Sequence, residues 1–438
     1  MTADSGALLL RELDEALGVS RSIAARLEDA RSRARYSFKE LLRLRLYLLS
    51  LGYEMQSDAD QLRADPALRL AISDARGLNP IERALPSQPT LSRFMRLLAS
   101  ESGRQALDRG LVDSAVAGIR RLCRRPSKRV LDIDSLPMAA HGLQGGSAYN
   151  GHYRYRCFHP QVVMDGSGHL LAARLRPGNE ATSKGATQLL EEVVDRLHAA
   201  GERVGRVRGD AGFPSEDLLA SLETRGIGYA FRLLNNSKLD RLAQQYLVRP
   251  AGRRPKEPRE WTHLLRYKAS RWSRERRLVL VVQERPDDLY LHHFFLVTSD
   301  EPTTGAQVLR FYRARGTMEA RLGEWINTVS AALSSSHRDG SRAASDDDGP
   351  FQVNAATLRL SALAYNLLHT LRQESAHARN AVLGNALGLA RARRMLLTLA
   401  GRLIVSARSA SLLIPASAAS LWSSVLARIR PPPDVVTA

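Results

Sequence analysis

The sequence predicts an α/β protein in which a strand-rich mixed sheet carries a β-rich insertion and is flanked by all-helical N- and C-terminal regions. Three observations predict this class. Apolar residues recur with a helical period over residues 1–125, short β-type runs alternate with helices over residues 126–234, and helical periodicity returns from residue 303. With 438 residues, 44% of them hydrophobic and 25% charged, the chain is typical of a globular protein with several domains.

The helical N-terminal region spans residues 1–125, where leucines and other apolar residues keep a helical rhythm. The turn at Gly18-Val19-Ser20 between two such stretches resembles a helix-turn-helix, and another helix opens at Pro89-Thr90. Helical hairpins of this kind either pack in a core or contact DNA. The residues leave both interpretations open.

An α/β core follows in two parts, residues 126–234 and residues 303–375. In the first part we expect helices at Thr182–Ala200 and from Pro214 onward. Its strands are expected at Val130–Leu136, Gln161–Asp165, His169–Leu175, Arg203–Arg208 and Gly228–Leu233.

The remaining segments interrupt or follow this core. Residues 235–302 are expected to be a β-rich, basic insertion with strands at 277–284 and 292–298. Residues 376–438 are expected to be a basic helical region with a tail. Composition also predicts a flexible loop at 334–349 and a disordered end at Pro431-Pro432-Pro433.

The chain is strongly basic, with 64 Lys and Arg residues against 45 Asp and Glu and a formal net charge of +19. Such an excess attracts nucleic acid, an anionic membrane or an acidic partner. Residues 241–285 hold 13 basic and four acidic residues, interleaved with Trp261, Tyr267 and Trp272, and a second basic stretch follows Glu374. The charge could serve solubility alone, but its concentration beside aromatic residues favours a DNA-binding surface.

Hydropathy and cysteine usage indicate a cytoplasmic protein with no membrane partner. The sequence has no apolar run of the roughly 18 residues that a membrane span requires, and no signal peptide is recognised. Cys123 and Cys157 lack the spacing of metal ligands, so neither a zinc site nor a disulfide framework is expected.

Several carboxylates lie where phosphodiester chemistry could use them. Asp132 and Asp134 are two residues apart on a predicted strand, so both project from one face. Asp210 follows another predicted strand, among small residues that permit close approach of a substrate. Enzymes that cut phosphodiesters commonly hold two divalent cations between Asp and Glu oxygens, and a cation would offset the repulsion between paired acids.

A further acid lies on a predicted helix. Tyr312, Arg315 and Glu319 stand at positions i, i+3 and i+7 and would share one helix face. Taken alone, each acid could equally be a turn cap, a helix cap or half of a solvated ion pair.

Together these residues resemble the DDE transposases of insertion sequences, whose signature is Tyr-(2)-Arg-(3)-Glu-(6)-Lys. Tyr312, Arg315 and Glu319 match it in order and spacing. The resemblance extends along the chain, closest to the insertion sequence 1380 branch, through these segments: Gly52-Tyr53-Glu54, Asp65-Pro66-Ala67-Leu68, Ser87-Gln88-Pro89-Thr90, His141-Gly142, Tyr149-Asn150-Gly151-His152-Tyr153, His159-Pro160, Arg208-Gly209-Asp210 and Ala364-Tyr365-Asn366-Leu367.

The resemblance implies a ribonuclease H-like catalytic core, with the β-rich insertion typical of this branch. It assigns Asp134, Asp210 and Glu319 as catalytic residues that bind two Mg²⁺ ions, which Mn²⁺ could replace. Asp134 is favoured over Asp132 because the family's ligand directly precedes a small hydroxyl residue, here Ser135. The implied reaction is in-line attack on DNA, first by water and then by a DNA 3′-hydroxyl.

The resemblance also implies double-stranded DNA as the partner, namely the element's terminal inverted repeats and its target. Tyr312 and Arg315 would contact the backbone near the scissile phosphate, to which a guanidinium can bind through two hydrogen bonds. Trp272, with Arg271 and Arg274 beside it, is the candidate for stacking on a flipped base. By analogy with cut-and-paste transposases, we expect a homodimer on DNA in the bacterial nucleoid.

One departure from the signature leaves alternatives open. The signature lysine should stand at position 326, where this chain has Ile326. An active transposase, a related ribonuclease H-like nuclease that cuts without joining, and a decayed copy that only binds its ends are all consistent with that change.

Ile326→Lys is expected to restore one phosphate contact. The slope of log binding constant against log salt concentration should then steepen by about 0.9 on duplex DNA, because each contact releases condensed counterions. Binding titrations over a series of salt concentrations measure this slope. Equal slopes for the native protein and the variant would contradict a missing contact.

Overall fold

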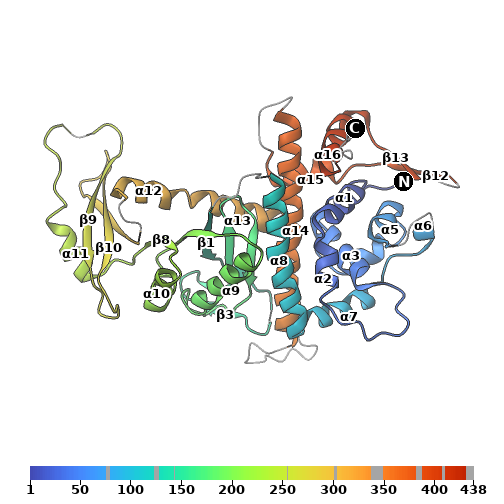
Figure 1. The fold of residues 1–438 in the computed structure, drawn as a ribbon, viewed down its shortest axis with the longest axis horizontal. Helices are drawn as coiled ribbons and strands as arrows, with labels where there is room; N and C mark the ends of the chain where they lie inside the picture. The colour runs from blue at the N-terminus through green and yellow to red at the C-terminus, as the bar shows by residue number, and fades with distance from the viewer. Residues whose placement is uncertain are drawn as a thin grey trace, which may run out of the picture.

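The computed structural model describes residues 1–74, 79–122, 128–142, 144–253, 255–299, 303–336, 349–380, 387–406 and 410–430. An eight-stranded mixed sheet forms its centre, with the strand order β6-β5-β1-β7-β8-β11-β10-β9. Helices from both ends of the chain gather at one end of this sheet (Figure 1). The predicted α/β class is confirmed.

Strand β1 (Arg129–Ser135) lies inside the sheet, antiparallel to β5 and parallel to β7. Each strand predicted for this part of the core is found within one residue of its expected bounds. Helix α9 begins four residues later than expected, because Gly185 with φ +75° precedes it. The elements are β5 (Gln161–Asp165), β6 (Leu170–Arg174), α9 (Ala186–Ala199), β7 (Val204–Gly209), α10 (Glu216–Thr224) and β8 (Gly228–Arg232).

A small three-stranded sheet, which the sequence analysis does not predict, lies between β1 and β5 along the chain. Its strands are too short to show a period, and the middle one is β4. The three strands are β2 (Met138–Ala139), β3 (Ala148–Asn150) and β4 (Tyr155–Phe158).

The insertion is β-rich as expected, and its strands continue the central sheet instead of forming a separate one. Strand β11 pairs antiparallel with β8, and β10 and β9 follow toward the edge. Strand β9 is not predicted from the sequence, because charged residues alternate along this edge strand. The elements are α11 (Ser237–Gln244), β9 (Arg259–Tyr267), β10 (Arg276–Glu284) and β11 (His292–Thr298).

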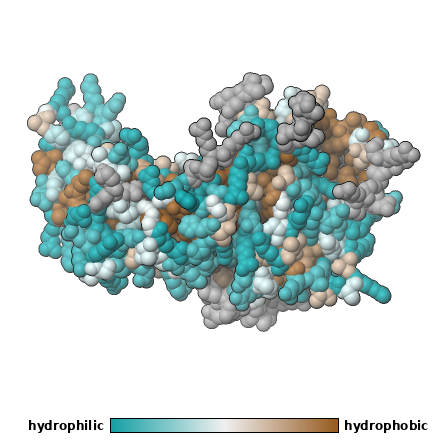
Figure 2. Space-filling view, in the orientation of Figure 1, coloured by the Kyte–Doolittle hydropathy of each residue, from teal (hydrophilic) through white to brown (hydrophobic). Residues whose placement is uncertain are grey.

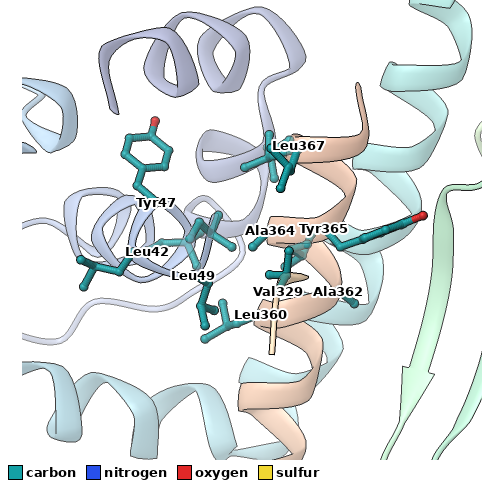
Figure 3. Packing of buried hydrophobic residues seen from close by; sticks show 14 of the residues in the cluster. Leu42, Tyr47, Leu49, Val329, Leu360, Ala362, Ala364, Tyr365 and Leu367 are labelled. Atoms are coloured by element: carbon teal, nitrogen blue, oxygen red, sulfur yellow. The ribbon is translucent and has the colours of Figure 1, made fainter. Parts of the chain in front are cut away.

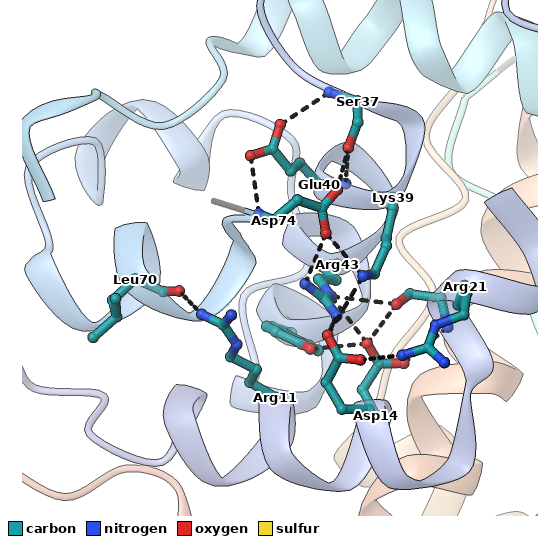
Figure 4. A network of polar contacts seen from close by, with 12 residues as sticks. Arg11, Asp14, Arg21, Ser37, Lys39, Glu40, Arg43, Leu70 and Asp74 are labelled. Atoms are coloured by element: carbon teal, nitrogen blue, oxygen red, sulfur yellow. Dashed lines mark hydrogen bonds and ion pairs between the residues drawn. The ribbon is translucent and has the colours of Figure 1, made fainter. Parts of the chain in front are cut away.

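The N-terminal region is helical, as predicted. The turn at Gly18 belongs to a buried polar network: Asp14 accepts from the Ser20 amide at 2.8 Å and from Arg43 Nε at 3.1 Å (Figure 4). These contacts favour the core-packing interpretation of the turn over DNA contact. The helices are α1 (Ala7–Leu17), α2 (Val19–Ala24), α3 (Phe38–Leu51), α4 (Asp58–Gln61), α5 (Pro66–Ile72), α6 (Asn79–Glu82), α7 (Gln88–Ala99) and α8 (Glu101–Leu122).

The C-terminal part corrects the expectation of an all-helical region, because β12 and β13 form a two-stranded sheet there. Most of the predicted loop at 334–349, the predicted tail at 431–433 and Cys123 lie outside the described residues. None of the helices in the described ranges is both long and apolar enough to cross a membrane. The elements are α12 (Gly305–Arg313), α13 (Gly316–Thr328), α14 (Gly349–Asn380), α15 (Leu389–Leu396), β12 (Arg402–Val405), β13 (Ala410–Leu413) and α16 (Ala416–Ile429).

Helix α14 joins the helical regions to the sheet. Leu49 of α3 points toward Leu360 and Ala364 of α14 in the largest hydrophobic cluster (Figure 3). On the sheet side, the buried Asn366 binds both the amide and the carbonyl of Leu170 in β6, each at 2.8 Å. Figure 2 shows hydrophobic residues gathered near α16, and the surface is hollowed over α12.

A buried ion pair fixes α12 against the sheet. Arg208 of β7 holds both carboxylate oxygens of Asp132 of β1 at 2.7 Å, and both side chains are almost fully buried. The remaining terminal nitrogen of Arg208 donates to the carbonyl of Phe311, in the last turn of α12, at 2.7 Å. One guanidinium therefore links two neighbouring strands and the helix that precedes Arg315.

Arg208→Met should lower the free energy of unfolding by about 3–5 kcal/mol, because it leaves Asp132 buried without its counter-ion. The double variant Asp132→Leu/Arg208→Met should recover much of this loss, since a buried pair can be replaced by apolar residues at little cost. Denaturant unfolding measures both. Arg206→Met is the control, because Arg206 is exposed on the same strand. Equal losses at Arg206 and Arg208 would contradict the proposed clamp.

A buried histidine of α14 is held in its neutral form. His369 Nε2 donates to the Ser167 carbonyl at 3.0 Å, and its Nδ1 accepts from Arg372 at 2.8 Å. A proton on Nδ1 would therefore face a guanidinium N–H. Burial, together with the nearby His169 and Arg372, lowers the pKa of His369 well below 6.5.

The free energy of unfolding of the native protein should fall as the pH drops below about 6.5. His369 then binds a proton in the unfolded chain but stays neutral in the folded protein. His369 can lower the free energy of unfolding by at most about 1.4 kcal/mol per pH unit. His369→Gln, which keeps one donor and one acceptor, should flatten this pH dependence, and His198→Gln on the exposed end of α9 should not. Urea unfolding at about pH 7.5 and about pH 5.5 measures the free energy of unfolding of the native protein and of both variants. Identical pH dependence in all three proteins would exclude His369 as the source.

Candidate active site

Asp134 and Asp210 stand at the carboxyl ends of neighbouring parallel strands, β1 and β7. Ile133 pairs with Gly209, so Asp134 is the next residue of β1 and Asp210 directly follows β7. Neighbouring strands lie about 4.8 Å apart, which brings both carboxylates to the same edge of the sheet. Asp134 accepts a hydrogen bond from the Ser135 amide at 2.8 Å, and Asp210 is exposed.

Asp134 is a shielded acid among other acids. Burial raises its pKa to about 6, and the charges of Asp210 and Glu319 add to the rise, while Arg315 and the Ser135 amide oppose it. The three predicted metal ligands are thus close enough to repel one another. A positive charge placed among them would be stabilised.

The signature residues do not lie on one continuous helix, which corrects the expectation of a shared helix face. Helix α12 ends at Arg313 and α13 begins at Gly316. In the turn between them, the Arg315 amide binds the Tyr312 carbonyl at 3.0 Å, three residues back instead of four. The turn places Arg315 directly before the first turn of α13, which carries Glu319.

The side chain of Arg315 lies among the carboxylates. Its Nη2 is 2.7 Å from Asp134 Oδ2, and its Nη1 binds Glu319. The residue is only 7% exposed, and its Nε has no hydrogen-bond partner. Burial alone would lower the pKa of Arg315, but Asp134, Asp210 and Glu319 outweigh it and raise the pKa above its usual value. The guanidinium is therefore the counter-ion of the acid cluster.

The donor set fits a hard divalent cation, because Asp134, Asp210 and Glu319 offer only carboxylate oxygens. In the parts of the chain that the structure describes, however, no three Asp, Glu, His or Cys side chains are gathered closely enough to hold a metal. Arg315 lies between two of the three acids, and it shows that this cluster accepts a cation.

The second acid of β1 is already neutralised. Asp132 binds Arg208 through both oxygens, as described above, and burial raises its pKa against the effect of Arg208. Asp134 lacks such a bidentate partner and stands nearer the strand end. The choice of Asp134 over Asp132 as a metal ligand stays a prediction.

Two tyrosines border the cluster. Burial, followed by the charge of Asp210, raises the pKa of Tyr312. Burial also raises the pKa of Tyr153, and the next largest effect is the charge of Asp134. Sequence reasoning did not assign Tyr153 to the site, although its segment was part of the resemblance. The signal was the dense run of aromatic residues from Tyr149 to Tyr155.

Trp272 is not placed to stack on a base. Its side chain is 8% exposed and packs edge-on against Tyr267, with the Arg276 guanidinium over its ring. Arg274 is exposed and forms an ion pair with Glu223 at 2.6 Å, and Arg271 is exposed. The burial of Trp272 argues against its predicted role, because the residue belongs to a hydrophobic cluster that also contains residues of the sheet and of α10.

Ile326 lies two helical turns after Glu319 on α13, is partly buried and packs against the main hydrophobic cluster. It also lines a cavity together with Pro137, Met138 and His141. Ile326 therefore has a packing role, and its presence also means that the signature lysine is missing.

The family model that matches this chain agrees with the resemblance found in the sequence. A family model described as Transposase DDE domain group 1 matches residues 1–433. Among solved structures, a similar chain is the piggyBac transposase in a synaptic complex with hairpin DNA, with 12% identity and a TM-score of 0.45 over 98% of this chain and 83% of that chain. No curated protein sequence matches. Since the family model spans nearly the whole chain, the protein belongs to the transposase DDE domain group 1 family.

Proposed function

We propose that this DDE transposase binds the terminal inverted repeats of its element, cleaves the DNA there and joins the freed 3′ ends to a target. The observation that carries the proposal is the meeting of Asp134 and Asp210 at the ends of adjacent parallel strands, with Glu319 held to Asp134 through Arg315. Acids at neighbouring strand ends can act together on one phosphodiester group.

Asp134, Asp210 and Glu319 would hold two Mg²⁺ ions, or Mn²⁺ in their place. When bound, such ions activate the attacking hydroxyl and stabilise the charge of the leaving oxygen. The protein itself contributes the fixed spacing of the acids on β1 and β7. It also contributes the Arg208 clamp, which holds α12 and thereby the Tyr312–Glu319 segment against the sheet.

The exposed cations favour the insertion as the main DNA surface. Arg253, Lys256, Lys268 and Arg271 are exposed along or beside the edge strand β9. In the C-terminal region, Arg391, Arg394 and Arg402 are exposed, but other arginines are engaged by protein groups: Arg393 donates to the Thr328 carbonyl at 2.6 Å, Arg428 pairs with Glu374 at 2.7 Å, and Arg430 pairs with Glu12. A polyanion would therefore find more available positive charge on the insertion.

The assembly and location follow from the same proposal. A homodimer would hold both ends of the element, since two cleavage sites must be processed together. The net charge of +19 would keep the protein on DNA in the nucleoid. A copy that binds its ends without cutting them remains the second candidate, and Ile326 is the observation that favours it.

Asp210→Asn should abolish cleavage while leaving binding to the ends nearly unchanged, because the amide keeps the shape but loses the charge that a cation requires. Asp217→Asn is the matched control, since Asp217 is an exposed acid of α10 a few residues away. A supercoiled plasmid carrying the element's ends, incubated with Mg²⁺ or with EDTA, provides the assay.

The same assay separates the alternatives. Cleavage without joining would select a nuclease, and binding without cleavage by the native protein would select a decayed copy. Cleavage by Asp210→Asn at the native rate would remove Asp210 from the catalytic site.

A further inference from the structure

We propose that Arg315 is an exchangeable counter-ion: it neutralises Asp134 and Glu319 while the protein is free of DNA, and a DNA phosphate draws it away and opens these acids to metal ions. The inference rests on the proposed function and specifies how its site is regulated. Its consequence is that DNA and divalent cations strengthen each other's binding.

The guanidinium of Arg315 already engages acids that metal ions would use. Arg315 Nη2 is 2.7 Å from Asp134, and Nη1 binds Glu319, so two of the three acids are engaged by one side chain. A guanidinium and a metal ion cannot both take the same carboxylate oxygens, because two positive charges would then lie in contact. Metal ions that bind Asp134 and Glu319 together must therefore displace Arg315.

The hydrogen-bonding capacity of Arg315 is incompletely satisfied where it lies. Its Nε is buried without a hydrogen-bond partner. Arg208 shows how a buried guanidinium is fully satisfied: it binds both oxygens of Asp132 and a backbone carbonyl. A buried donor that lacks a partner favours exchange toward a ligand that can satisfy it. A phosphate can accept two parallel hydrogen bonds from a guanidinium.

Arg315 is buried, but one of its two partners faces solvent. Arg315 lies in the turn between α12 and α13, and its side chain is 9% exposed. Glu319, its second partner, has a side chain that is 57% exposed. Movement of Arg315 to the solvent side would break two ion pairs, and Arg315 belongs to none of the hydrophobic clusters.

These features imply reciprocal coupling. If phosphate binding removes Arg315 from the acids, metal affinity must rise, and by linkage metal binding must raise DNA affinity by the same factor. Couplings of this type commonly amount to about 5- to 150-fold. Lysine could neutralise the acids but would bind phosphate as a point charge, so arginine suits both positions.

The test is a titration of the full-length protein with Mn²⁺, read from the electron paramagnetic resonance signal of the free ion, with and without a short duplex of mixed sequence. Native protein should bind Mn²⁺ at least about fivefold more tightly with the duplex. Arg315→Gln should bind Mn²⁺ more tightly than native protein without DNA, and the duplex should add nothing. Arg313→Gln, an exposed neighbour that pairs with Glu260, should behave as native.

Two further variants make the outcome decisive. Arg315→Lys retains the charge and should show reduced coupling, and it replaces Arg315→Gln if thermal unfolding shows that the latter does not fold. Asp210→Asn should bind little Mn²⁺. If Asp210→Asn loses Mn²⁺ while Arg315→Gln and Arg315→Lys match the native protein in affinity and coupling, the exchange of Arg315 is refuted and the proposed function stands. If native protein binds no Mn²⁺ in either condition, the metal site itself is refuted.

Discussion

The parallel pairing of β1 with β7 is the constraint on which the rest of the structure depends. It brings Asp134 and Asp210 to one edge of the sheet, although they are 76 residues apart in the chain (210 − 134). A parallel pair needs a crossover, and α9 supplies it by packing on the sheet. A slip of one residue would turn Asp134 to the opposite face, so the buried side chains of β1, which fix the register, also fix the site.

Two arginines beside this pair of strands perform different tasks for the same physical reason. Each acid of β1 would be unstable if buried alone, and each meets a guanidinium. Arg208 is bound on three sides by Asp132 and the Phe311 carbonyl, and this rigid contact fixes α12. Arg315 holds two separate acids through single contacts and retains an unpartnered nitrogen. The saturated pair is architectural, and the unsaturated one can respond to a ligand.

Much of the core could be predicted from the sequence, because its strands are short apolar runs between clear turn signals. Strands β1, β5, β6, β7 and β8 are found within one residue of their expected bounds. Edge strand β9 could not be predicted in this way, since exposed charges interrupt its apolar pattern. Spacing predicted Arg315 and Glu319 as site residues, but it could not reveal that the helix breaks between Arg313 and Gly316. Nor could it show that Trp272 is buried, because burial of an aromatic ring in a basic segment depends on partners such as Tyr267 and Arg276 that only the fold brings together.

The motif Ala364-Tyr365-Asn366-Leu367 shows why a resemblance to a family does not by itself identify a catalytic residue. Asn366 is buried and binds both backbone groups of Leu170, so it satisfies part of the open edge of β6. Tyr365 donates to the Gly168 carbonyl at 3.1 Å, and His369, one helical turn later, donates to Ser167. One face of α14 thus clamps the turn between β5 and β6, and β5 is the other neighbour of β1. The motif therefore acts on the site through the sheet: it holds the antiparallel side of β1 while the Arg208 clamp holds the parallel side, and Asp134 lies at the end of the strand between them.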